Sequence, residues 1–198
     1  MLLVIEGIDG VGKSTQADAL QAWLEGAGLD VVRSKEPTDG PHGRELRRSM
    51  VEGRLPPRQE LDLFLDDRRE HVAQLIGPAL SAGRIVLLDR YYFSTVAYQG
   101  ARGFEPDALL AENEAFAPAP DALFILDMPA AVSVARIRAE RGDGVDTFEV
   151  PEALERSRSI FLDLAKRADY ALVIDADATR DAIQDAMQAR VRALLSAP

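Results

Sequence analysis

The sequence predicts an α/β fold in which a five-stranded parallel sheet is flanked by helices. Five short apolar segments, bounded by turns or helix signals, are too short for helices and have the length of strands. Helical patterns separate them, and this alternation is typical of a parallel sheet covered by helices. The predicted strands are 2–6, 31–35, 85–89, 122–127 and 171–175. The predicted helices are 13–26, 44–53, 58–82, 106–116, 129–141, 151–167 and 179–195.

The order of these elements also predicts where a ligand binds. Right-handed crossovers bring the carboxyl ends of all parallel strands to one edge of the sheet, where open α/β sheets bind ligands. The chain of 198 residues is long enough to bury its own core, so residues 1–198 are expected to form a single domain. The glycine-containing segment 142–147 is the best candidate for a mobile loop.

Composition excludes several classes of protein. The net charge of −10 disfavours nucleic acid as a partner, because the phosphate backbone is also negative. The absence of cysteine excludes disulfides and thiolate metal sites, and two histidines are too few for a zinc centre. There is neither a signal-peptide pattern nor an apolar stretch long enough to span a bilayer, so a cytoplasmic protein without a membrane partner is expected.

A phosphate-binding loop follows the first predicted strand and opens the first predicted helix. Residues 7–14 read GIDGVGKS and fit the pattern G-x-x-x-x-G-K-[ST]. Glycines let the backbone wrap around phosphates, the helix N-terminus adds positive potential, and Lys13 adds a charge near the β- and γ-phosphates. The residues expected to bind ATP here are Gly7, Ile8, Asp9, Gly10, Val11, Gly12, Lys13, Ser14 and Thr15.

The loop alone does not distinguish kinases from other nucleotide-binding proteins. A switch GTPase normally carries N-K-x-D, whereas the only asparagine of this chain, Asn113, precedes glutamate. A catalytically silent nucleotide-binding module and a deoxynucleoside kinase both remain open. In the second alternative, Glu36 after the second strand acts as a base on a sugar hydroxyl.

Residues 6–16, together with DRY at 89–91 and STVAYQG at 94–100, resemble the bacterial thymidylate kinase family. Further matches are Glu-Pro at 36–37, LDMP at 126–129 and DTFE at 146–149, so the resemblance runs over nearly the whole chain in the right order. It implies the P-loop nucleoside monophosphate kinase fold and a homodimer. It also implies Mg²⁺-dependent phosphorylation of thymidine monophosphate by ATP, with a mobile lid at about residues 138–149.

Phe64 and Arg68 are the candidate base site. Phe64 lies on an apolar helical stripe and on sequence alone is slightly favoured as a core residue, whereas the resemblance makes it the platform for thymine. Arg68 lies one turn away on the same face and can donate to a base carbonyl. The alternative for Arg68 is a surface ion pair with Asp62, Asp66 or Asp67.

Other acceptor contacts surround the third predicted strand. Arg90 is expected to grip the acceptor phosphate through its planar guanidinium, and Asp89 to bind Mg²⁺ directly or through water, with Ser14 as a second ligand. A structural arginine–aspartate pair is the alternative for Arg90. Asp9 can meet a sugar hydroxyl or a metal-bound water, and Tyr98 can exclude a ribose 2′-hydroxyl. The resemblance adds Ser94, Thr95, Glu36, Pro37 and Phe148 to the acceptor contacts, although a plain turn explains Pro37 equally well.

The positive charge that stabilises the phosphoryl group during transfer is expected to come partly from the lid. The loop position after Asp9 is Gly10, so the phosphate loop has no arginine there. Arg141 is the first candidate and Arg138 the second, in a segment that ends a helix and enters a glycine-containing loop. The alternative is that both arginines only favour the helix C-terminus. The predicted catalytic residues are therefore Lys13, Arg90, Arg141 and Asp9.

Overall fold

The computed structural model describes residues 1–141 and 151–196, except for the side chains of residues 140 and 141. In these residues, five parallel strands form one sheet in the order β2-β3-β1-β4-β5. The strands are β1 (Leu2–Glu6), β2 (Val31–Lys35), β3 (Ile85–Asp89), β4 (Ala122–Asp127) and β5 (Ala171–Asp175). All five have the bounds predicted from the sequence.

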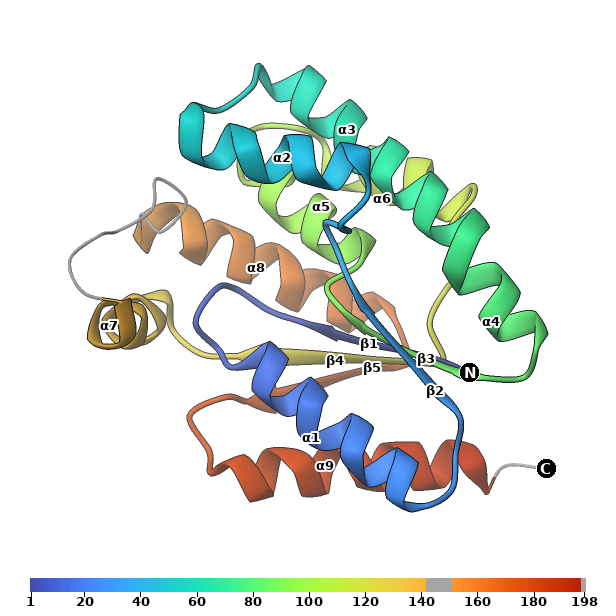
Figure 1. Ribbon diagram of the computed structural model, residues 1–198. Coiled ribbons are helices and arrows are strands. Elements are labelled where there is room, and N and C mark those ends of the chain that lie inside the picture. The colour runs from blue at the N-terminus through green and yellow to red at the C-terminus, as the bar shows by residue number, and fades with distance from the viewer. Residues whose placement is uncertain (142–150, 197–198) are drawn as a thin grey trace.

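Helices cover both faces of the sheet (Figure 1). On one face α1 (Lys13–Gly26) and α9 (Arg180–Leu195) lie side by side. On the other face are α3 (Pro57–His71), the π-helix η1 (Val72–Ile76), α4 (Gly77–Ser81), α5 (Tyr92–Gly100), α6 (Pro106–Glu114) and α8 (Pro151–Arg167). Helix α2 (Pro41–Glu52) packs on α3, and α7 (Ala130–Arg141) follows β4 at the carboxyl edge of the sheet.

The central strands form the core because helices bury both of their faces. Every residue of β1 and β3 is buried, whereas the edge strands β2 and β5 are mostly half-buried or exposed. This agrees with the continuous apolar runs that a parallel sheet requires. The carboxyl ends of the strands lie together, so the loops that follow them share one edge.

One helix was not predicted, and one predicted helix is interrupted. Helix α5 buries six of its nine residues, so it lacks the polar face that makes a helix visible in sequence. The predicted helix 58–82 contains a π-turn, in which the N–H of Gly77 reaches the carbonyl of Val72, just before Pro78. Proline has no N–H to continue an α-helical ladder, which gives a physical reason for the irregularity at this point.

The remaining helices agree with the predictions to within about one turn. Helix α2 begins three residues earlier than predicted, because Pro41 suits the first turn of a helix. Thr179 is the N-cap of α9 rather than its first residue, and its side chain accepts from the N–H of Ala182. The predicted loop 142–147 lies outside the described residues. No helix within residues 1–141 and 151–196 has the length and apolar character needed to cross a membrane.

Candidate functional site

The phosphate loop connects β1 to α1 at the carboxyl edge of the sheet. Gly7 has a φ of 136°, and a Cβ there would lie 2.4 Å from the carbonyl oxygen of Leu126. Gly12 is the N-cap of α1 with a φ of 91° and offers no side-chain cap. Gly12 therefore leaves the first N–H groups of α1 without a side-chain cap from this position, which makes the helix start suitable for an anion.

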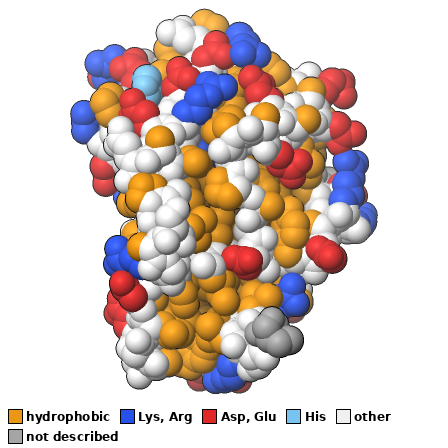
Figure 2. All heavy atoms as spheres, turned by 90° about the vertical axis from the view of Figure 1, so that its right-hand side faces the viewer, with side chains coloured by type: hydrophobic (Ala, Val, Ile, Leu, Met, Phe, Trp, Pro, Cys, Tyr) orange, Lys and Arg blue, Asp and Glu red, His pale blue; other side chains and the backbone are white. Residues whose placement is uncertain are grey.

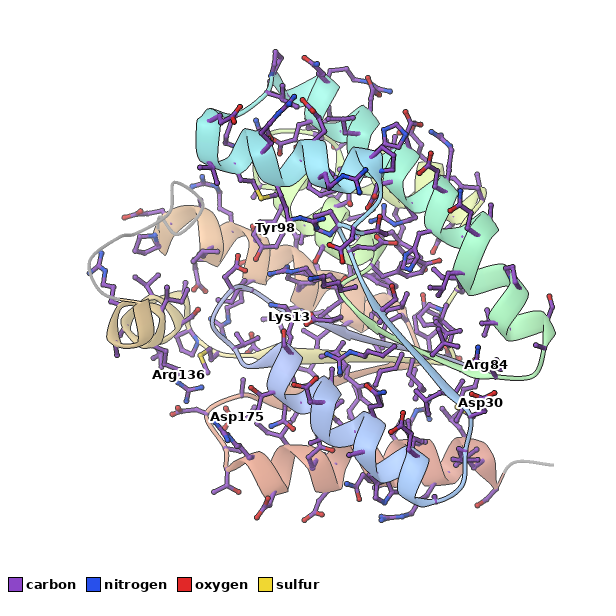
Figure 3. The ribbon with its side chains drawn as sticks, viewed as in Figure 1. Lys13, Asp30, Arg84, Tyr98, Arg136 and Asp175 are labelled. Atoms are coloured by element: carbon purple, nitrogen blue, oxygen red, sulfur yellow. The ribbon has the colours of Figure 1, made fainter. Side chains whose placement is uncertain are left out.

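Lys13 is buried within the same loop and has an unusual environment. Its Nζ donates to the carbonyl oxygens of Gly7, at 3.0 Å, and Ile8, at 2.7 Å. Burial lowers the pKa of Lys13 to about 8, and the positive charge of Arg90 also lowers it. The negative charges of Asp9, Asp89 and Glu6 raise the pKa of Lys13 but do not offset its burial, so an anion bound beside it would stabilise the ammonium group further. In Figure 3, Lys13 and Tyr98 lie well away from the end of the sheet where Arg84 pairs with Asp30.

Ser14 and Asp89 meet beside the phosphate loop, as their predicted shared role requires. The Ser14 hydroxyl donates to Oδ2 of Asp89 at 2.5 Å, although the two residues are 75 positions apart in the chain. Ser14 and Asp89 line a surface hollow of about 460 Å³, which Lys35 also lines. Hydroxyl and carboxylate oxygens are the ligands that Mg²⁺ prefers, so this pair is suitable for that ion.

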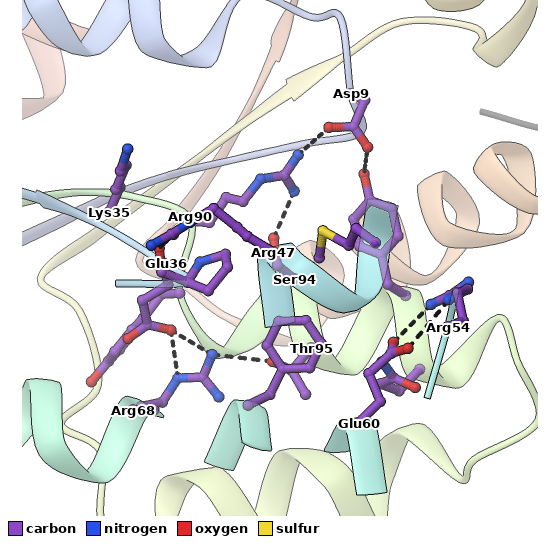
Figure 4. A pocket seen from close by; sticks show the side chains of 16 residues that line it. Asp9, Lys35, Glu36, Arg47, Arg54, Glu60, Arg68, Arg90, Ser94 and Thr95 are labelled. Carbon is purple, nitrogen blue, oxygen red and sulfur yellow. Dashed lines mark hydrogen bonds and ion pairs between the residues drawn. The ribbon is translucent and has the colours of Figure 1, made fainter. Parts of the chain in front are cut away.

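Arg90 is held at the same edge in a conformation that non-glycine residues rarely adopt. Its φ is 72°, and its Nη2 lies 2.5 Å from Oδ1 of Asp9. Its Nη1 donates to the Ser94 hydroxyl at 3.0 Å, and the hydroxyl of Tyr98 donates to the other oxygen of Asp9 at 2.8 Å (Figure 4). Arg90 therefore pairs with Asp9 of the phosphate loop and not with the neighbouring Asp89.

Glu6 holds the backbone that presents Arg90. This buried carboxylate accepts hydrogen bonds from the N–H groups of Tyr91 and Ser94 and from the Ser94 hydroxyl. Burial raises the pKa of Glu6 to about 7, although Arg90 and these hydrogen bonds act in the opposite direction. Glu6 thus connects the end of β1 to the start of α5.

A cavity of about 490 Å³ opens next to Arg90 and contains most of the predicted acceptor residues. Phe64 is half-buried on its wall and does not belong to the buried core, in which its neighbours Leu61 and Leu65 lie. The predicted residues that line the cavity are Asp9, Glu36, Pro37, Phe64, Arg68, Arg90, Ser94, Thr95 and Tyr98. The cavity has the size of a small-ligand site.

Arg68 lies on the wall of this cavity and is only 1% exposed. Its Nε and Nη2 donate to Oε2 of Glu36 at 2.9 and 2.5 Å (Figure 4). Nη2 also donates to the Thr95 hydroxyl at 3.1 Å, and Nη1 to Oδ1 of Asn113 at 2.6 Å. The proposed surface ion pair with Asp62, Asp66 or Asp67 is wrong, because Arg68 points into the protein and pairs with Glu36.

Glu60 is, with Glu36, one of two buried glutamates that line the cavity, and it lies across the cavity from Arg68 (Figure 4). It is 1% exposed, and Arg54 and Arg102 approach its Oε1 to 2.7 and 2.6 Å. Gln99 donates to the same oxygen at 2.9 Å. These contacts connect the segment after α2 to α3 and α5, and they close one side of the cavity.

Several residues that line the cavity were not predicted from the sequence. They are Lys35, Arg47, Met50, Arg54, Glu60, Tyr91 and Gln99. Tyr91 and Gln99 lie next to predicted residues and could have been included on that basis. The residues from α2 and the segment after it carried no such signal, because only the packing of α2 on α3 brings them to the cavity.

The predicted lid residues are only partly within the described structure. Arg138 is exposed on α7. The backbone of Arg141 belongs to the same helix, but its side chain, the loop 142–150 and Phe148 lie outside the described residues. Thr15 is exposed in the first turn of α1, beside the phosphate loop. The predicted roles of these residues therefore stay predictions.

Comparison with known proteins identifies similar chains over almost the whole length. The family model described as thymidylate kinase matches residues 5–187. The thymidylate kinase of Xanthomonas campestris pv. campestris is 53% identical over 196 residues, which cover 99% of this chain and 85% of that protein. The thymidylate kinase of Akkermansia muciniphila is 51% identical over 195 residues, which cover 98% of this chain and 91% of that protein.

Proposed function

The chain belongs to the thymidylate kinase family, whose members phosphorylate thymidine monophosphate with ATP as donor, and we propose how its residues perform this reaction. One observation carries the proposal. Asp9 of the phosphate loop pairs with Arg90 on the wall of the 490 Å³ cavity, so a donor site and an acceptor site meet at one edge of the sheet. Phosphoryl transfer requires this proximity of two phosphate sites.

The acceptor binds in the cavity with its phosphate toward Arg90 and its base toward Phe64 and Arg68. Phe64 offers an aromatic face for stacking. Among the described residues, the contacts of Arg68 use four of its five N–H groups, which leaves one N–H on Nη1 for a base carbonyl. Tyr98, held by Asp9, narrows the space around the sugar and excludes a ribose 2′-hydroxyl.

ATP binds with its β- and γ-phosphates against the phosphate loop. The N–H groups at the start of α1 and the ammonium group of Lys13 face these phosphates, and Lys13 exchanges its two carbonyl partners for phosphate oxygens. Arg138 and Arg141, in a lid at about residues 138–149 of a single domain formed by residues 1–198, add positive charge when ATP is bound.

Ser14 and Asp89 would hold Mg²⁺ together with oxygens of the ATP phosphates. The fit rests on their two oxygens, 2.5 Å apart beside the phosphate loop. The described residues contain no group of three or more His, Cys, Asp or Glu side chains that could hold a metal ion. Mg²⁺ sites in kinases need only one or two carboxylates plus substrate phosphates, so this pair is sufficient. When bound, the ion supplies positive charge to the donor phosphates.

Catalysis by these residues consists of alignment and charge neutralisation. The acceptor phosphate is already a nucleophile at neutral pH, so the protein does not need a strong general base. Arg90 holds this phosphate in line with the donor, while Lys13 stabilises the charge that develops on the transferred group. Asp9 orients Arg90 through their ion pair.

The surroundings of Glu36 argue against a deoxynucleoside kinase. In that alternative, Glu36 takes a proton from a sugar hydroxyl. Here Oε2 of Glu36 accepts two hydrogen bonds from Arg68, and Oε1 contacts His71. Both carboxylate oxygens therefore already have partners, and the arrangement supports binding rather than proton abstraction.

A homodimer and a cytoplasmic location complete the proposal. Hydrophobic side chains gather on the face shown in Figure 2. Partly buried apolar residues of η1, α4 and α6 border the core on that side of the molecule, among them Leu75, Leu80 and Leu110. One chain has a mass of 21.6 kDa, and light scattering should give twice this value. We also propose a cytoplasmic location, because the substrates ATP and thymidine monophosphate are found in the cytoplasm.

A panel of acceptors tests the proposed function directly. Purified protein with ATP and Mg²⁺ should release ADP with thymidine monophosphate, and much more slowly with thymidine, uridine monophosphate or deoxycytidine monophosphate. Arg90→Ala serves as the matched variant and should lose most of this activity. Preferred phosphorylation of thymidine would restore the deoxynucleoside kinase. Absence of ADP release with every acceptor would favour a silent nucleotide-binding module.

A further inference from the structure

His71 lies behind the acceptor cavity and is not one of the residues that line it. No sequence motif indicates a function for this histidine. Its side chain is 3% exposed, its Nδ1 lies 3.0 Å from Oε1 of Glu36, and its Nε2 lies 2.8 Å from the Ser34 hydroxyl. Both ring nitrogens therefore have a partner, which fixes the orientation of the ring.

The two oxygens of Glu36 have different partners. Oε1 contacts His71, whereas Oε2 accepts from both Nε and Nη2 of Arg68. A carboxylate that pairs with a guanidinium accepts hydrogen bonds, so Nδ1 of His71 is assigned as the donor in this contact. The imidazole therefore sets the plane of the carboxylate, and the carboxylate sets the plane of the Arg68 guanidinium.

The backbone supports this frame from two elements. Arg68 and His71 are three residues apart on α3, so their side chains share one face of the helix. Ser34 lies in β2 and Glu36 is the first residue after that strand, so both belong to its carboxyl end. The contacts thus form a closed frame in which Ser34 anchors His71, His71 holds Glu36, and Glu36 holds Arg68.

We propose that His71 is a positioning residue that fixes Glu36, and through it Arg68, for recognition of the pyrimidine base. The inference rests on the proposed acceptor site. A correctly oriented N–H of Arg68 favours a carbonyl oxygen of the base, as in thymine, over an amino group, as in cytosine. Loss of the His71 contact should therefore weaken both the binding of thymidine monophosphate and the discrimination against deoxycytidine monophosphate.

Two substitutions of His71 distinguish the contributions of its two ring nitrogens. Asparagine places its amide close to the position of Nδ1, and glutamine places its amide close to that of Nε2. His71→Asn keeps a donor for Glu36, whereas His71→Gln keeps only a partner for Ser34. We expect His71→Gln to raise the KM for thymidine monophosphate about tenfold and to reduce the preference over deoxycytidine monophosphate by a similar factor. His71→Asn should stay within about threefold of the unsubstituted protein, and the KM for ATP should change little in either variant.

Ser34→Ala and the unsubstituted protein are the controls. Ser34→Ala removes only the outer anchor and should raise the KM for thymidine monophosphate less than His71→Gln does. Equal effects of the two His71 substitutions, or parallel changes in the KM of both substrates, would show that His71 only stabilises the fold and would overturn the proposal. If the unsubstituted protein did not phosphorylate thymidine monophosphate, the proposed function itself would fail.

A measurement on the folded, unsubstituted protein keeps the proposal testable if His71→Gln does not fold. The chain has two histidines, and the other, His42, has a side chain 32% exposed. His42→Gln therefore assigns the imidazole signals in an NMR spectrum. Thymidine monophosphate should shift the ring signals of His71, because its base binds to Arg68, which His71 supports through Glu36. Ring signals that do not move at saturating thymidine monophosphate would overturn the proposal.

Discussion

Replacement of Lys13 by Met should change both catalysis and the pH dependence of stability. The substitution keeps most of the length of the side chain but removes the ammonium group, which donates to the carbonyl oxygens of Gly7 and Ile8. Turnover should fall by about a hundredfold or more, because charge on the transferred phosphoryl group loses its partner. Without nucleotide, the difference in the free energy of unfolding between the two proteins should depend on pH, because the buried ammonium group titrates.

The magnitude follows from the pKa of Lys13. Burial lowers this pKa from 10.5 to about 8, so the folded protein holds the charged form less well than the unfolded chain does. The contribution of Lys13 to stability is therefore fully present above pH 10.5 and is lost as the pH falls through about 8. The whole shift corresponds to roughly 3 kcal/mol, of which roughly 2 kcal/mol is expected between about pH 7.5 and about pH 9.5.

Urea unfolding of the protein and of Lys13→Met, without nucleotide, measures this effect. Other groups titrate just below and just above this pH range. The pKa of Glu6 is raised to about 7, so stability from Glu6 is lost as the pH rises through that value and this loss lies mainly below the range. Tyrosines of the unfolded chain titrate near pH 10, just above it.

The free energy of unfolding of the unsubstituted protein should rise relative to that of Lys13→Met by roughly 2 kcal/mol from the lower to the higher pH. Added ATP and Mg²⁺ should stabilise the unsubstituted protein most, since bound phosphate adds negative charge beside the buried ammonium group. A constant difference between the two proteins across this range would refute the destabilised ammonium group. Near-normal turnover of a folded Lys13→Met would refute its role in phosphoryl transfer.

Three further predictions concern the cavity and the lid. Phe64→Ala should weaken binding of thymidine monophosphate by roughly 1 to 3 kcal/mol, the value of a base–aromatic stack, with little loss of thermal stability because Phe64 is only half-buried. Calorimetric titration measures this, and unchanged affinity would assign Phe64 a packing role. Arg141→Ala should lower kcat far more than the affinity for thymidine monophosphate. If kcat stays within about threefold for both Arg141→Ala and Arg138→Ala, a barrier change of only about 0.7 kcal/mol, the lid arginines are not catalytic. Glu60→Gln should destabilise the fold by about 3 kcal/mol, because it leaves two arginines beside a neutral group in a buried network. An unchanged urea midpoint would contradict this.

The sequence determined the sheet and the phosphate loop. Strand segments such as 85–89 are short, apolar and bounded by turns, and this local pattern is sufficient to predict their bounds. The P-loop was predictable for the same reason, since its glycines, Lys13 and Ser14 are contiguous in the chain. Helix α5 could not be found in this way, because burial on most sides removes the polar face that periodicity detects.

Only the tertiary structure decided which residues line and support the acceptor cavity. Arg68 was expected to donate to a base carbonyl or to pair with a surface aspartate, and the packing of the chain buries it against Glu36, which follows β2, and Asn113 of α6. The same packing joins His71 to Glu36 across 35 residues of sequence and brings Arg54 to Glu60 at the far wall. A charged side chain loses its contact with water only when the chain folds, and it then needs a partner from whichever segment packs against it. That segment can be distant in sequence, and no local pattern indicates which segment it will be.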